Sequence, residues 1–159
     1  MVEVKPFFKK GEGFRIPSKI HDALEVLFIE YCEDLNQIPD FANDELTDLL
    51  GARTPLHAIF VARNEQKRTV GMCFATKHQE NTWGLGGAFV AESHRGQRIF
   101  SVIMAAVKTA AREENVRFLL VEPSVEGPEY WRPAMARWGF REIEGKDDEW
   151  QMDLRKIKR

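Results

Sequence analysis

The chain has 159 residues, 43% hydrophobic and 30% charged, which is typical of a single globular domain with one core. Its formal net charge of −2 argues against binding to nucleic acid or to an anionic membrane surface. No apolar run approaches the roughly 20 residues of a membrane span, and the first residues do not resemble a secretory signal. We therefore expect a cytoplasmic protein.

The chain has only two cysteines and four histidines, and none of them has the spacing of a metal site. Cys32 and Cys73 both lie in apolar patterns, which favours reduced cysteines packed in the core. We expect no bound metal.

The first strong pattern along the chain begins at Ser18, where apolar residues recur at helical spacing as far as Leu35. Pro39 ends this helical region, and Asn43 is a typical N-cap for a short second helix that stops at Gly51. An additional strand before Ser18 also fits the pattern.

Strand patterns follow these helices. Residues 56–63 and 69–76 flank the polar turn "NEQKR", which predicts a hairpin. A third strand, "TWGLGGAFVAE", contains Gly84, Gly86 and Gly87, which are poor strand formers. Glycines inside a strand indicate a bulge, or close approach by another backbone or a ligand.

The second half of the chain alternates helices and strands. A long helix is predicted over about 97–115, then a short apolar strand, "RFLLVEP", then a helix over about 128–138 that ends at Gly139. Residues 140–155 form a terminal hairpin. The predicted fold class is α/β, with a mixed sheet and helices on both faces.

The turn between the third strand and the long helix, "SHRG", suits a phosphate. A helix start presents unpaired backbone N–H groups and partial positive charge. Gly96 permits close approach by the backbone, Arg95 and Arg98 add positive charge, and Ser101 adds a hydroxyl. Taken alone, such a turn is more often an ordinary connector with solvated arginines.

The order of elements, together with "VAESHRGQRIF" and "ARWGF", resembles the GNAT superfamily of acyl-CoA-dependent N-acetyltransferases. The family's cofactor motif is Arg/Gln-x-x-Gly-x-Gly/Ala. Arg95 fills its first position, whereas Arg98 and Phe100 stand where the family has small residues. The resemblance implies one GNAT-like domain over residues 1–159, in which residues 18–51 form acceptor-side helices and residues 82–138 form the cofactor-binding core.

The resemblance also implies a reaction. Acetyl-CoA would be the cosubstrate, without a metal, and a primary amine would attack its thioester directly. Backbone N–H groups near Phe89 and Val90 would hold the thioester carbonyl, and the pantetheine arm would lie between this strand and "RFLLV". The implied cofactor-binding residues are Phe89, Val90, Arg95, Gly96, Gln97, Arg98, Ile99, Phe100 and Ser101.

The catalytic acid and base are less well matched. Where many family members have an acidic tyrosine this chain has Met135, and Tyr130, the candidate acid, lies five residues earlier. Its position is also typical of an aromatic residue that packs on a sheet. The strand before the motif holds no glutamate, so we assign no base. Residues that could act as one are Glu30, Glu33, Asp34, His78 and Glu80.

The acceptor is an unknown amine: a small molecule, a peptide N-terminus or a protein lysine. Glu33, Phe41 and Trp83 are candidates for its pocket, although a solvated acidic face and core packing explain them equally well. The sequence is also compatible with a homodimer. An alternative function is a catalytically degenerate acyl-CoA sensor or protein-interaction module, which Phe100, Met135 and the missing strand glutamate favour.

Overall fold

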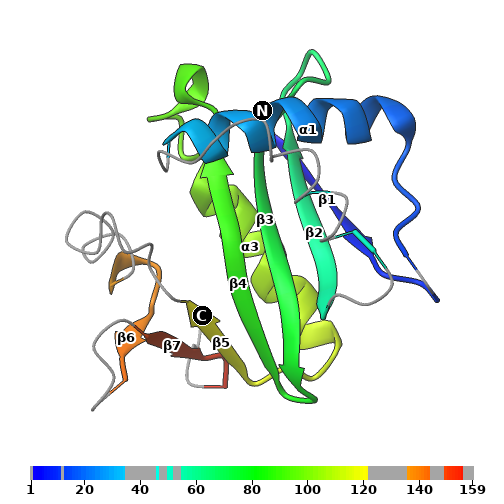
Figure 1. Cartoon of the computed structure of the whole chain (residues 1–159). Coiled ribbons are helices and arrows are strands. Elements are labelled where there is room, and N and C mark those ends of the chain that lie inside the picture. Colours follow the sequence, from blue (N-terminus) through cyan, green and yellow to red (C-terminus); the bar gives the residue numbers. More distant parts are fainter. Residues whose placement is uncertain are drawn as a thin grey trace.

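The computed structural model describes residues 2–11, 13–34, 46, 50–51, 55–121, 136–143 and 149–155. These residues form one seven-stranded sheet in the order β1-β2-β3-β4-β5-β7-β6 (Figure 1). The strands are β1 (Glu3–Phe8), β2 (Leu56–Arg63), β3 (Thr69–Gln79), β4 (Thr82–Val90), β5 (Phe118–Val121), β6 (Arg141–Glu142) and β7 (Trp150–Asp153).

The sheet is mixed. Its first four strands are antiparallel neighbours, β4 and β5 pair in parallel, and β7 lies antiparallel between β5 and β6. A parallel pair needs a crossover connection, and the helix α3 (Ile99–Glu113) supplies it between β4 and β5. The start of α3 is therefore tied to the end of β4.

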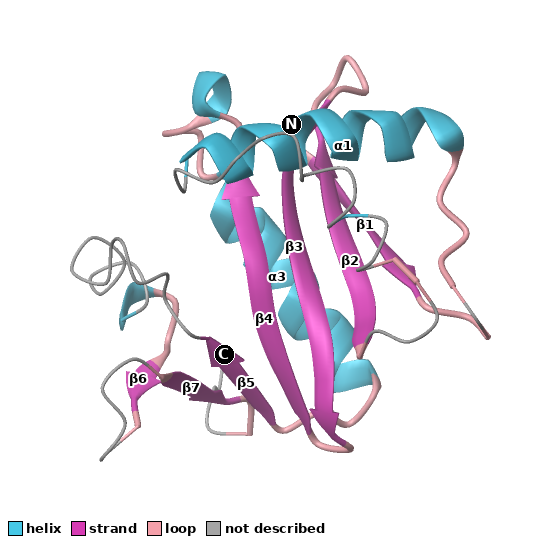
Figure 2. Ribbon diagram, in the orientation of Figure 1, coloured by secondary structure: helices cyan, strands magenta, loops and turns pink. Residues whose placement is uncertain are grey.

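Two helices cover opposite faces of the sheet, as Figure 2 shows: α1 (Ser18–Asp34) lies across one face and α3 runs along the other. The alternation of strand side chains gives each helix its own apolar cluster. On the α3 side, Ile103 and Val107 pack with Trp83 and Leu119. On the α1 side, the cluster joins helix residues to strand residues, among them Leu24, Leu27, Phe28, Ile59, Met72, Phe74 and Phe89.

The structure confirms the predicted mixed α/β fold. The first helix begins at Ser18, the hairpin of β2 and β3 is present, and the additional strand before Ser18 is β1. Trp150, Met152 and Leu154, which alternate along β7 and just beyond it, are buried in the apolar cluster on the α3 side. β3 extends three residues beyond its predicted end, and β4 stops at Val90. The helix predicted over about 97–115 is α3 (Ile99–Glu113). The helix predicted between Asn43 and Gly51 and the one predicted over about 128–138 lie mostly outside the described residues.

Both cysteines are free and buried, which confirms them as core residues. Burial raises the pKa of the Cys73 thiol to about 12, so this thiol stays protonated and unreactive near neutral pH. Of the helices described, none has the length and apolar character needed to cross a membrane.

Candidate active site

The end of β4 is irregular where the glycines predict irregularity. β4 pairs with β3 at Met72–Phe89 and at Phe74–Gly86, so one residue of β3 faces two residues of β4, and the ladder bulges at positions 87–88. Gly86 is exposed, and a side chain added there would meet no atom within 4 Å. The bulge therefore adjoins an open space on the α1 face of the sheet.

Among the described residues, β4 pairs with β5 only through residues 82–85. The last of these pairs is Leu85–Val121. The Ala91 N–H donates to the Val70 carbonyl of the neighbouring antiparallel strand at 2.8 Å. Because backbone groups alternate in direction along a strand, the N–H and C=O of Val90 point to the β5 side. The bulged end of β4 thus directs a backbone donor to the β5 side, beyond the last described pair of the two parallel strands.

The connection from β4 to α3 is tight. A short 3-10 helix, η2 (Glu92–His94), leads to Gly96 with φ of 83° and to Arg98, the N-cap of α3, with φ of 59° and ψ of 22°. The left-handed region suits Gly96 but strains Arg98. It is also the reason why a glycine fits the position of Arg98 in the family motif.

The N-terminus of α3 is open to an anion. Arg98 makes no capping hydrogen bond through its side chain, and the first turn of α3 holds no acidic residue. The first N–H groups of a helix have no partner within it, and they carry partial positive charge. Gly96, Gln97, Arg98 and Ser101 are exposed around this end, whereas Ile99 is buried in the core.

Arg95 folds back onto the end of β4. Its Nε donates to the Val90 carbonyl at 3.0 Å, and its guanidinium carbon lies 5.1 Å from the centre of the Phe89 ring. Its side chain therefore braces the turn against the strand. Arg95 was predicted from the motif alone, and the sequence did not reveal this contact.

Phe100 packs sideways rather than standing alone at the helix start. Its ring stacks on Trp138, with 4.1 Å between ring centres and 11° between planes. Trp138 belongs to "ARWGF", and its carbonyl accepts a hydrogen bond from Lys108 Nζ at 3.2 Å. Phe100 stands where the family motif has its second small residue, and here its ring joins α3 to the segment 136–143.

Two neighbouring residues of α1 reach the same end of β4. The Glu92 N–H donates to Glu30 Oε1 at 3.0 Å, and the Tyr31 ring lies 5.5 Å from the Phe89 ring, edge to face. Glu30 was one of several candidate bases. Tyr31 was missed as a site residue, because helical spacing marked it only as a member of the apolar stripe.

Trp83, a candidate for the acceptor pocket, lies in the core of the described structure. Its side chain is completely buried in the cluster on the α3 side, against His57 and Phe60. Alternation along β4 turns it away from α1, which the sequence could not show before the faces were assigned.

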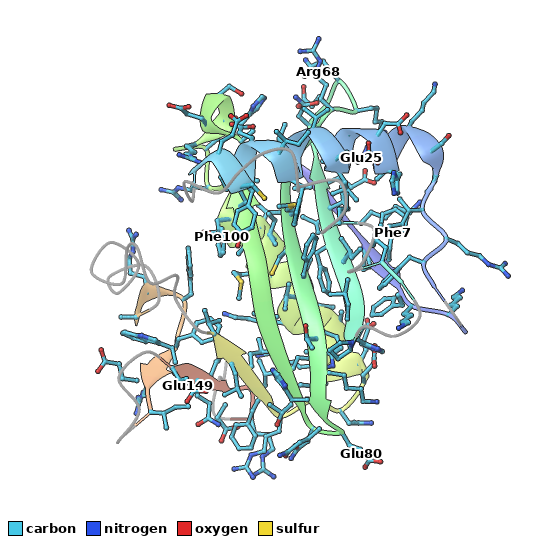
Figure 3. The ribbon with its side chains drawn as sticks, in the orientation of Figure 1. Phe7, Glu25, Arg68, Glu80, Phe100 and Glu149 are labelled. Atoms are coloured by element: carbon cyan, nitrogen blue, oxygen red, sulfur yellow. The ribbon has the colours of Figure 1, made fainter. Side chains whose placement is uncertain are left out.

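The other candidates are scattered. Glu33 is exposed on α1, and His78 lies against Gly84, where its imidazole occupies the space that a side chain would need. Glu80 lies at the opposite end of the sheet from Phe100, as Figure 3 shows. Phe41, Tyr130, Met135 and the side chain of Asp34 lie outside the described residues.

A groove of about 330 Å³ opens at the other end of β4, far from the turn. Seven residues of extended strand, about 23 Å, separate its Thr82 from Phe89. Its lining is amide-rich and apolar: His78, Gln79, Asn81, Thr82, Phe118, Leu120, Ile143 and Gln151. It does not adjoin the bulge.

Within the described part of the chain, one group of side chains could approach a metal: His21, Asp22 and Glu25. All three lie on the first turns of α1, and His21 already contacts Glu25 at 3.4 Å. Such groups are common on helix surfaces, so this one supports no metal site.

Comparison with solved structures places the fold. An acetyltransferase of the GNAT family from Staphylococcus aureus Mu50 shares 15% identity and a TM-score of 0.69, covering 97% of this chain and 99% of that chain. Tetrahymena GCN5 shares 10% identity and a TM-score of 0.69, covering 96% of each chain. The GNAT family N-acetyltransferase YhbS from Escherichia coli, solved in complex with CoA, shares 14% identity and a TM-score of 0.62, covering 97% of this chain and 81% of that chain. At such identities these likenesses show the fold alone.

Comparison of sequences identifies the family. No curated protein matches the chain. The model of the acetyltransferase (GNAT) family, however, matches residues 20–129, which include most of α1, the bulged strand, the Arg95–Gly96 turn and the whole of α3. The chain therefore belongs to the acetyltransferase (GNAT) family.

Proposed function

We propose that the protein is an N-acetyltransferase that moves the acetyl group of acetyl-CoA to a primary amine by direct attack. Membership of the family supports an acyltransferase, and the complex of the Escherichia coli relative with CoA supports a CoA-based cosubstrate. In this proposal residues 82–138 carry the cofactor-binding core and residues 18–51 shape the acceptor side.

The observation that carries the proposal is the uncapped N-terminus of α3 beside the open edge of β4. The N–H groups of the turn and of the first helical residues would hold a pyrophosphate, because a helix start favours an anion and a guanidinium suits phosphate oxygens. Both arginines of the turn are exposed: Arg98 stands at the N-cap position of α3, and Arg95 donates to the Val90 carbonyl and so braces the turn against β4.

The bulged end of β4 would hold the reacting group. The Val90 N–H would donate to the thioester carbonyl oxygen and stabilise the negative charge that develops there during attack. The amine would arrive from the α1 face, where Gly86 leaves an opening. A C–N bond forms, the C–S bond breaks, the nitrogen gives up a proton and the sulfur receives one.

The protein needs a catalytic acid for the leaving sulfur of CoA less than it needs a base for the attacking amine nitrogen. A thiol has a pKa of about 8.5, so a thiolate can leave without a strong acid. An ammonium ion must lose a proton before it attacks, and a general base can contribute about 10²–10⁴-fold. Tyr130 remains our candidate acid, and no base is assigned.

The first test is binding. Acetyl-CoA at 100 times its dissociation constant should stabilise the protein by about 2.7 kcal/mol and raise its melting temperature. Pantetheine, which lacks the phosphates, is the matched control and should give a much smaller shift. If millimolar acetyl-CoA gives no shift, the proposal fails.

The second test separates an enzyme from an acyl-CoA sensor. The protein is incubated with acetyl-CoA and a mixture of small amines, peptides and lysine-rich protein, and free thiol is measured. Amine-dependent thiol release is expected. Binding without release would support the alternative, a degenerate sensor or interaction module, which Met135 and the absence of a glutamate from β4 favour.

A further inference from the structure

We propose that Glu30 is a positioning residue for the cofactor turn, supplied by the acceptor-side helix α1. This inference rests on the proposed function. The contact joins residues 62 positions apart: the Glu92 N–H donates to Glu30 Oε1 at 3.0 Å. Neither residue belongs to the turn from Arg95 to Ser101, so a role for Glu30 there is indirect.

The contact supplies a cap that the local sequence lacks. Glu92 is the first residue of η2, and Ala91, which precedes it, has no side chain that could accept a hydrogen bond from the helix start. An N–H group at a helix start needs an acceptor from elsewhere. Glu30 provides it with a carboxylate, and hydrogen bonds to charged acceptors are stronger than those between neutral groups.

The same segment is held on both sides of Ala91. Its own N–H donates to the Val70 carbonyl, the preceding carbonyl of Val90 accepts from Arg95 Nε, and the following N–H of Glu92 donates to Glu30. One anchor lies in the sheet, one in the turn and one in α1. These three contacts fix the direction in which the chain leaves β4 and enters the anion-binding turn.

Glu30 is itself well supported. The neighbouring Tyr31 packs on Phe89, and Leu27 and Phe28 are buried in the cluster on the α1 side. Positioning residues act only when their own place is fixed by packing. Because α1 also belongs to the acceptor side in the proposed function, an acceptor bound against α1 would be sensed at the cofactor turn through this hydrogen bond.

The test compares four proteins by calorimetric titration with CoA: wild type, Glu30→Ala, Glu30→Gln and Glu25→Ala. Glu25 is a matched control, because it is a glutamate of the same helix whose carboxylate contacts His21 rather than the segment after β4. Loss of a hydrogen bond to a charged group should weaken CoA binding by about tenfold in Glu30→Ala. Glu30→Gln keeps an acceptor oxygen and should stay within about threefold of wild type, and Glu25→Ala should match wild type.

Amide hydrogen exchange supplies a readout that general destabilisation would not give. In Glu30→Ala, exchange should accelerate at residues 92–98 and stay unchanged in β2. Equal CoA affinity of Glu30→Ala and wild type would overturn the inference and leave the proposed function intact. Uniformly faster exchange, or a Glu30→Gln variant as weak as Glu30→Ala, would also overturn it. Failure of wild type to bind CoA would overturn both.

Discussion

The two ends of β4 belong to one strand and are built for different purposes. At its beginning, residues 82–85 pair with β3 on one side and with β5 on the other, and Trp83 is completely buried. At its end, the ladder with β3 bulges, the described pairing with β5 has stopped, and Gly86 faces open space. The first half of β4 lies in the core, whereas the second half leaves backbone groups available to a ligand.

This difference shows how a buried strand can also serve a site. Backbone donors are available to a ligand only where the sheet does not use them, and a bulge with adjacent glycines creates such a place. The fully paired half keeps the open half in position. We therefore expect substitutions in the first half to change stability, and substitutions beyond Val90 to change ligand binding.

The largest expected effect lies in the paired half. Trp83→Ala should lower the free energy of unfolding by about 3–5 kcal/mol, because it removes a large buried side chain and leaves a cavity. Trp83→Phe should cost less, since it also removes an indole N–H that is buried without a hydrogen-bond partner among the described atoms.

Urea denaturation measures the free energy of unfolding of both variants. Gly86→Ala, in the second half of β4, is the contrasting substitution. The added methyl group meets no atom within 4 Å, so stability should change by less than about 1 kcal/mol. A Gly86→Ala variant as unstable as Trp83→Ala would remove the distinction between the two halves.

A smaller effect is expected at Arg95. Arg95→Ala should weaken CoA binding by about 1.5–3 kcal/mol, because the contact with the Val90 carbonyl that braces the turn is lost. Arg95→Lys keeps the positive charge without the guanidinium that packs on Phe89, and should bind CoA nearly as weakly. Calorimetric titration measures the affinity of each variant for CoA. Wild-type affinity in Arg95→Ala would mean that this contact does not organise the site.

The smallest effect concerns backbone strain at Arg98. Arg98→Gly should raise the free energy of unfolding by about 1 kcal/mol, because glycine adopts the left-handed conformation without steric cost. Arg98→Ala keeps the strain and removes the charge, so its stability should match wild type. In CoA titrations both variants should bind more weakly if the guanidinium contacts phosphate. A destabilised Arg98→Gly would contradict this account.

Much of the fold could be predicted because local patterns determine it. Helical spacing from Ser18 and the apolar runs of β2 and β5 each followed from neighbouring residues. The glycines of β4 indicated a bulge, but only the register against β3 placed it at positions 87–88. The turn was found because its residues are contiguous in the sequence.

The features that could not be predicted depend on distant contacts. Regular alternation would put Trp83 and Phe89, six residues apart, on the same face of the sheet. The bulge between them turns them to opposite faces, and the sequence did not show which face held α1. The contact of Glu30 with Glu92 spans 62 positions, and the stack of Phe100 on Trp138 joins two segments that no pattern links. Such pairs are visible only once the chain is folded.

The Phe100–Trp138 stack also constrains which substitutions this sequence can accept during evolution. A small residue at position 100 would restore the family motif and remove the ring that covers one face of Trp138. Exchange of Trp138 alone would remove the ring on which Phe100 stacks. We therefore expect the two positions to be inherited together, so that relatives carry either both large aromatic rings or neither.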